Sequence, residues 1–312
     1  MKNIQADIKS GNFKQVYLLY GEEAYLKQQY KQNLVKALNP DGDTMNFNHY
    51  EGKGIDVKQL IDLCETMPFF AERRVVLLED TGFFKNKCEE LADYMKELPD
   101  YLYLVFAETE VDKRNRMYKA VKACGSIAEF IRQDEKTLMR WAAGILGKAG
   151  KKITQRDMEL LLTKTGTDMG NLRMEMEKLI SYTEGRDVVT AEDIEEICTT
   201  QTTNRIFDMV RAVTEKNQKR ALELYYDLLT LKEPPMRILF LLAKQYRQLL
   251  LAKQFAAAGL AQTEIGSKLG VPGFVVKNIT TCARAYTISE LEQAVKDFVD
   301  AEESVKTGRL ED

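Results

Sequence analysis

The chain has 312 residues, which is long enough for two or three domains with separate cores. Its 45 Lys and Arg residues against 48 Asp and Glu residues give a formal net charge of −3, so it lacks the basic surplus of an autonomous nucleic-acid binder. It has no run of 18 apolar residues and no signal-peptide core, and its 5 cysteines lie far apart in the sequence. We therefore expect a cytoplasmic protein with reduced thiols, no membrane span and no bound metal.

The first 130 residues alternate short apolar runs with amphipathic segments. This order predicts a mostly parallel sheet with helices on its faces, because parallel strands need crossover connections. The expected strands are 16–20, 47–51, 75–78, 101–107 and 126–130. The helices expected between them are 23–37, 57–66, 88–96 and 114–123.

The first expected strand runs into Gly21, Glu22 and Glu23, at the place of a phosphate-binding loop. A working P-loop has the pattern Gly-x4-Gly-Lys-Ser/Thr, in which backbone amides and the lysine hold phosphates and the hydroxyl holds magnesium. Here no second glycine and no Gly-Lys-Ser/Thr follow. The two carboxylates suit a helix N-terminus but would repel a triphosphate. The sequence therefore predicts the architecture of a nucleotide-binding domain with a degenerate P-loop, and neither ATP hydrolysis nor a cofactor.

Other residues of catalytic type receive structural interpretations. His49 is the only histidine, and it lies in the alternating segment 45–51, so a structural or solvent-facing role is favoured over catalysis or zinc binding. Glu79 and Asp80 end a strand as magnesium-holding carboxylates do, but without a P-loop we interpret them as a solvated strand terminus. Arg173 is placed like a lid arginine, and pairing with nearby acids such as Glu177 is expected.

The connector before the third strand contains Met67, Pro68, Phe69 and Phe70. Pro68 disfavours a helical conformation at Met67, so the preceding helix should stop there. Two adjacent phenylalanines are unusual on a connector, which normally carries polar residues. The spacing alone favours packing of both rings under the sheet. The alternative is a projecting pair that anchors in a partner's pocket, where each buried ring would contribute about 1.5–3 kcal/mol.

From Asp134 onwards we expect helices and no further strand. Thr154 and Thr190 are expected N-caps. The longest helix follows Pro234-Pro235 and continues to about residue 258. Its first half is apolar nearly all round, which indicates the spine of a helical bundle or an oligomer interface. The expected short helices are 136–147, 154–163, 168–182 and 191–197, and a separate helical block begins at about residue 204.

The segment 263–277 scans as a helix-turn-helix. A recognition helix presents polar side chains in its first turn to read base edges. This one would present Phe274, Val275 and Val276, which are expected to pack into a core. DNA recognition by this segment is therefore kept only as an alternative.

Together these features resemble the delta subunit family of the bacterial DNA polymerase III clamp loader, over essentially the whole chain. The resemblance rests on the segments 16–23, 67–74, 112–114 and 300–308. It implies an α/β plus all-α architecture with three domains. These are an AAA+-type α/β domain without a working P-loop at 1–134, a small helical lid at 135–203, and a C-terminal helical collar at 204–312.

The resemblance also implies a function in DNA replication. Phe69 and Phe70, flanked by Met67 and Pro68, would insert into a hydrophobic pocket of the beta sliding clamp and help open the ring for loading on primed DNA. The family often has leucine where Phe69 stands. This implication makes clamp contact the favoured interpretation of the two rings, over packing under the sheet.

The resemblance implies partners as well. The collar would join the gamma/tau and delta prime subunits, and primer-template DNA would be contacted only within the complex. The chain would act in the polymerase holoenzyme without an ATPase activity of its own. An autonomous AAA+ ATPase, a helix-turn-helix-like DNA-binding protein and a helical adaptor stay open as alternatives.

Overall fold

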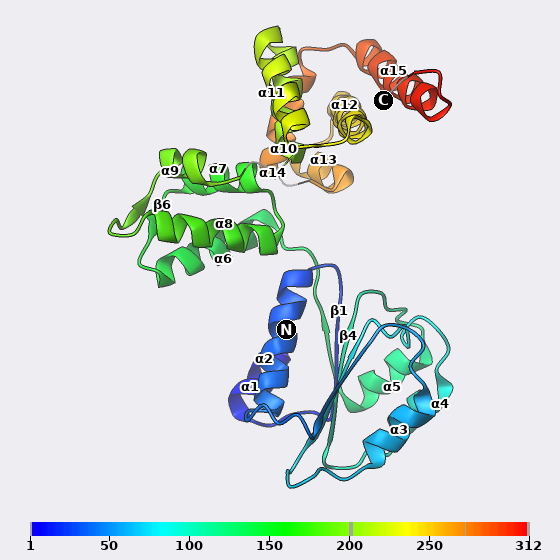
Figure 1. The fold of residues 1–312 in the computed structure, drawn as a ribbon. Helices are drawn as coiled ribbons and strands as arrows, with labels where there is room; N and C mark the ends of the chain where they lie inside the picture. Colours follow the sequence, from blue (N-terminus) through cyan, green and yellow to red (C-terminus); the bar gives the residue numbers. More distant parts are fainter. Residues whose placement is uncertain (1, 200–201, 272, 311–312) are drawn as a thin grey trace. The chain divides into compact units, whose positions relative to one another are not determined.

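The computed structural model describes residues 2–199, 202–271 and 273–310 (Figure 1). The chain divides into two compact units, one up to Gln133 and one from Asp134. The further division of the second unit at residue 203 stays a prediction.

A five-stranded parallel sheet forms the centre of the first unit, with the strand order β2-β3-β4-β1-β5. The expected parallel α/β architecture is confirmed, and each strand lies within one residue of its expected bounds. The strands are β1 (Val16–Tyr20), β2 (Phe47–Glu51), β3 (Arg74–Glu79), β4 (Leu102–Glu108) and β5 (Ser126–Glu129).

Helices cover both faces of this sheet (Figure 1). Successive residues of a strand point to opposite faces, so Leu18 packs in one core cluster and Leu19 in the other. Because both faces are covered, the central strands are apolar at nearly every position. One face carries α1 (Lys2–Ser10) and α2 (Ala24–Leu38), and the other carries α3 (Val57–Glu65), α4 (Glu89–Tyr94) and α5 (Arg116–Cys124).

The parallel topology separates the two stretches that the sequence singled out. The degenerate P-loop follows β1, so it lies at the carboxyl edge of the sheet. The connector with Phe69 and Phe70 precedes β3, so it lies at the amino edge. The two sites are therefore at opposite edges of one sheet.

The first part of the second unit contains four helices and a pair of very short strands among its described residues. The expectation of no further strand is wrong, because β6 (Lys152–Ile153) pairs in parallel with β7 (Val188–Val189). Two residues are too few to produce a periodicity. The expected caps are confirmed: Thr154 accepts from the amide of Asp157, and Thr190 forms a capping box with Asp193. The helices are α6 (Glu135–Lys148), α7 (Gln155–Thr165), α8 (Met169–Tyr182) and α9 (Ala191–Ile197).

The remaining helices pack around α12 (Pro235–Ala257), which contacts α10, α13, α14 and α15. Leu249 and Ala252 of α12 are fully buried, whereas Phe240 in its first half is 59% exposed. The predicted helical spine is thus confirmed, and part of its apolar surface remains uncovered in the isolated chain. The other helices are α10 (Thr202–Thr214), α11 (Gln218–Thr230), α13 (Gln262–Leu269), α14 (Gly273–Ala283) and α15 (Ile288–Lys306). Within the described residues, every helix is too short or too polar to span a bilayer.

Candidate functional site

The candidate site is the connector between α3 and β3, residues 66–73, which we call the recognition loop. Asp56 caps α3 by accepting from the amides of Lys58 and Gln59, while Leu60 and Cys64 bury one face of the helix against the sheet. The helix ends at Glu65, before Met67, the position at which Pro68 disfavours a helical conformation. The loop therefore has a fixed helix on one side and a fully buried strand on the other.

The large apolar side chains of the recognition loop point into solvent. Met67 is 75% exposed, Phe69 58% and Phe70 95%, whereas Pro68 and Arg73 are partly buried. The two rings pack edge to face with their centroids 4.5 Å apart. Packing of the rings under the sheet, which the spacing alone favours, is therefore wrong. The spacing misled because a connector has no periodic face that ties a side chain to the core.

The backbone of the recognition loop is held by two buried polar side chains. Asn46, which directly precedes β2, accepts from the Phe69 amide at 2.6 Å and donates to the Phe69 carbonyl at 2.8 Å. Arg74, the first residue of β3, donates from Nε to the carbonyl of Thr66 at 2.8 Å and from Nη2 to that of Met67 at 3.2 Å. The loop is thus anchored through its main chain, which leaves its apolar side chains free.

Arg73 fixes the end of the loop next to β3, and Phe70 has an unusual backbone conformation. The guanidinium of Arg73 lies over the rings of Phe13 and Tyr103, 5.2 Å and 5.4 Å from their centroids. Phe70 itself has φ +49°, a left-handed conformation that is uncommon for a bulky residue. Such conformations persist where the surrounding structure determines them, and they cluster at functional sites.

The degenerate P-loop is closed by the protein's own backbone. The amide of Glu23 donates to the carbonyl of Phe130 at 2.9 Å, so this donor is not directed at an open phosphate site. A Cβ on Gly21 would lie 2.3 Å from the same carbonyl oxygen. Glu23 is buried, and Glu22 is exposed beside Arg132 at 3.4 Å. The loop turns back onto the end of β5 and presents the Glu22 carboxylate to solvent.

The strand ends near this loop form an internal ion network. Lys31 pairs with Glu79 at 2.6 Å, and His49 lies 2.9 Å from the other oxygen of that carboxylate. The interpretation of Glu79 as a solvated terminus is therefore wrong, because α2 brings the Lys31 ammonium and β2 the His49 imidazole to it. Lys27, six residues after Gly21, donates to the carbonyl of Glu108 at 3.0 Å, and its burial lowers its pKa. Lys27 follows Gly21 at the distance that separates the first glycine and the lysine of a P-loop. This spacing was the sequence signal that could have identified Lys27 as a residue of this site.

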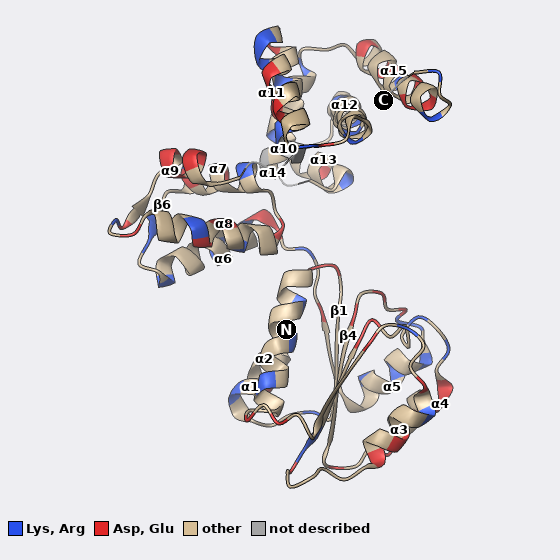
Figure 2. Cartoon of the chain, viewed as in Figure 1, with Lys and Arg blue, Asp and Glu red and all other residues tan. Residues whose placement is uncertain are grey.

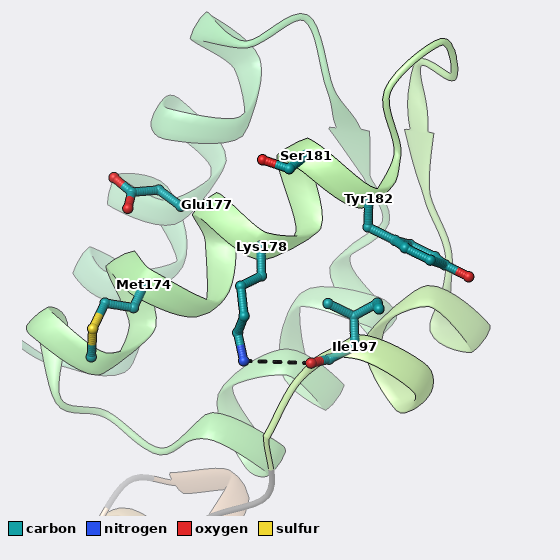
Figure 3. A pocket seen from close by; sticks show the side chains of 6 residues that line it. All are labelled: Met174, Glu177, Lys178, Ser181, Tyr182 and Ile197. Atoms are coloured by element: carbon teal, nitrogen blue, oxygen red, sulfur yellow. Dashed lines mark hydrogen bonds between the residues drawn. The ribbon is translucent and has the colours of Figure 1, made fainter.

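Helix α8 holds the remaining candidate of the nucleotide type. Arg173 donates to Oε1 of Glu177 at 2.8 Å, as expected from their spacing. An open pocket of about 650 Å³ lies along the same helix (Figure 3). Its Lys178 pairs with Glu175 at 2.6 Å and reaches the carbonyl of Ile197 at 3.5 Å. The pocket is lined by Met174, Glu177, Lys178, Ser181, Tyr182 and Ile197.

The helix-turn-helix-like segment is realised as α13 and α14. Val276 is fully buried and Val275 is partly buried, in agreement with the expected packing of this turn into a core. The side chain of Phe274 lies outside the described residues.

Charges of both signs occur along α8 and α11 (Figure 2). Among the described residues, no cluster of His, Cys, Asp and Glu has the geometry of a metal site.

Family models match both ends of this chain. The model of the DNA polymerase III delta subunit matches residues 17–130, and that of the delta subunit's C-terminal domain matches residues 203–312. The chain belongs to the DNA polymerase III delta subunit family. The first match contains the degenerate P-loop and the recognition loop, and the second contains the helices from α10 to α15.

Full-length relatives agree with this assignment. The chain is 26% identical over 320 residues to DNA polymerase III subunit delta of Bacillus subtilis, with 98% of this chain and 92% of the relative covered. It is 22% identical over 276 residues to the probable DNA polymerase III subunit delta of Aquifex aeolicus, with 84% and 77% covered. A solved structure, the DNA clamp loader delta protein of Bacillus subtilis, is similar with a TM-score of 0.66 and 24% identity, covering 99% and 95%. The α/β plus all-α fold expected of this family is confirmed.

Proposed function

We propose that this chain is a clamp loader subunit of the replicative DNA polymerase III holoenzyme. It binds the beta sliding clamp through the recognition loop and helps to open the ring for loading on primed DNA. The single observation that carries this proposal is the exposure of Phe69 and Phe70 on a loop whose backbone is anchored by buried side chains. Membership of the DNA polymerase III delta subunit family supports the choice of the sliding clamp as the partner.

The energetics of the loop suit a small hot spot. The two exposed aromatic rings and Met67 form an apolar cluster that a partner's pocket could bury. Complete burial of a ring in a pocket contributes about 1.5–3 kcal/mol. Aromatic anchors of this kind, surrounded by weaker contacts, carry most of the affinity of many interfaces.

Ring opening in this account needs no ATP in this subunit. A ligand shifts a conformational equilibrium only by its differential affinity for the two states. We propose that Phe69 and Phe70 bind the open clamp better than the closed clamp. The closed P-loop, with Glu22 and Glu23, supports a role without hydrolysis. ATP binding in the gamma/tau subunits would then decide when the pair is available.

Assembly with the gamma/tau and delta prime subunits is assigned to the helices after residue 203, with primer-template DNA contacted only in the complex. The exposed Phe240 on α12 supports an interface there. The alternative of autonomous DNA recognition by α13 and α14 is disfavoured by the burial of Val276. The net charge of −3 also disfavours autonomous DNA binding, because such proteins normally carry a basic surplus.

The test is binding of the purified chain to the sliding clamp of the same organism. The double variant Phe69→Ala/Phe70→Ala should lose at least about a hundredfold in affinity, since two rings are removed. Its circular dichroism spectrum should be unchanged, because both rings are exposed. Phe240→Ala is the matched control, as Phe240 is 59% and Phe69 58% exposed. Equal binding by the double variant and the control would refute the proposal.

A further inference from the structure

We propose that Asn46 is a positioning residue for clamp binding. It holds the recognition loop in its binding-competent shape before the partner arrives. This inference rests on the proposed function, and it adds a residue from a different part of the chain to the site.

Asn46 is held rigidly, and its side chain in turn holds the backbone of Phe69. It is only 4% exposed, and its own carbonyl accepts from the Val75 amide at 2.9 Å, which fixes its backbone to β3. Its side chain closes a two-point contact with Phe69, accepting from the amide and donating to the carbonyl. Its Nδ2 also donates to Oδ2 of Asp43 at 2.5 Å, which fixes the orientation of the amide. Both ends of the Asn46 side chain are therefore used.

The Asn46 side chain holds Phe69, whose backbone determines where the two rings point. Phe69 is itself one of the two rings, and Phe70 follows directly with φ +49°. Arg74 holds the loop on the other side of Pro68, at Thr66 and Met67. Without Asn46, the described residues offer no other side-chain hydrogen bond to the backbone of 68–73, and only the stacking of Arg73 holds that side of the loop. Phe70 can then leave the left-handed conformation that L-residues disfavour.

This role has a kinetic signature. If only a fraction of molecules holds the competent loop, the apparent dissociation constant rises by the inverse of that fraction. The loss falls on association, because once the clamp holds both rings the contacts in the complex are the same as in the wild type. Removal of a ring contact instead speeds dissociation. Positioning and contact residues are thus separated by which rate constant changes.

The experiment measures association and dissociation rates for the full chain and the clamp by surface plasmon resonance. Asn46→Ala should lower the apparent association rate about tenfold through the loss of two hydrogen bonds, with dissociation changed less than about twofold. Phe70→Ala should mainly raise the dissociation rate. Hydrogen exchange of the free protein should show lost protection at the Phe69 amide in Asn46→Ala. Asn46→Ser, which keeps a polar hydroxyl without setting a second carboxylate beside Asp43, should fall between and serves if the alanine variant does not fold.

The matched control is Asn115→Ala. Asn115 also holds backbone groups through its side chain, accepting from the Met117 amide at 2.8 Å and donating to the Asn86 carbonyl at 2.9 Å, but it does not contact the loop. It should lower stability without changing the association rate. The inference is overturned if Asn46→Ala associates like the wild type or no more slowly than Asn115→Ala while Phe70→Ala still weakens binding. If the wild type does not bind, the proposed function fails and this inference fails with it.

Discussion

Phe69 and Phe70 show how a single position can escape sequence reasoning. An aromatic pair on a connector is compatible with burial and with projection, and spacing favoured burial. The outcome depends on Asn46, which directly precedes β2, and on Arg74, the first residue of the neighbouring strand β3, whose hydrogen bonds hold the loop. Asn46 lies 23 residues from Phe69 in the sequence, so no local pattern announces the contact. The resemblance to a family favoured projection, and the residue-level geometry supplies its cause.

Gly21 gives a prediction at the same scale. It has φ +124°, and a Cβ there would meet the Phe130 carbonyl oxygen at 2.3 Å. We expect Gly21→Ala to lower the free energy of unfolding by about 3 kcal/mol, from backbone strain together with the clash. Gly11→Ala is the control, since Gly11 has φ +73° but open space around it, and should cost only about 1 kcal/mol. Calorimetric unfolding distinguishes the two, and equal losses would show that the contact with Phe130 does not matter.

The central strands of the first unit were predictable because burial on both faces makes each of them a continuous apolar run, as in Val16–Tyr20 and Val75–Leu78. Helix α1 was not predicted. It is a short polar segment in which Ile4 is the one fully buried side chain among its described residues, so its packing onto the sheet leaves little periodic trace. Strands β6 and β7 were missed because two residues carry no alternation. The N-caps Thr154 and Thr190 were predictable because each accepts a hydrogen bond from an amide only three residues later in the sequence.

The connector before β2 gives a pH prediction at the element scale. The Asn46 side chain and then the Met45 amide donate to Asp43 and lower the pKa of its carboxyl. Because the folded pKa lies below the unfolded value of about 3.9, this contribution is present above that value and is lost as the pH falls through the folded pKa. The difference in unfolding free energy between wild type and Asp43→Asn should therefore shrink below about pH 4. Urea titrations at pH 6 and at pH 3 measure it, and a difference that grows on acidification would contradict the network.

At the scale of the whole molecule, the first unit resembles a nucleotide-binding domain in which the two edges of the sheet have separate roles. At the carboxyl edge, Phe130 closes the P-loop and Lys31 pairs with Glu79. At the amino edge, the recognition loop presents apolar side chains. The helices of the second unit from α10 onwards leave Phe240 uncovered, as expected of a chain that assembles with other subunits. The division of the second unit into a lid and a collar stays a prediction.

The central claim is that this chain opens the clamp through Phe69 and Phe70 without nucleotide of its own. The most direct measurement loads the sliding clamp on circular DNA and follows its release by an excess of the purified chain, with no ATP present. The wild type should release the clamp, and Phe69→Ala/Phe70→Ala should release it at least about tenfold more slowly, since the binding energy of two rings is missing. Equal release by both proteins, or release by the wild type only when ATP is added, would contradict the account.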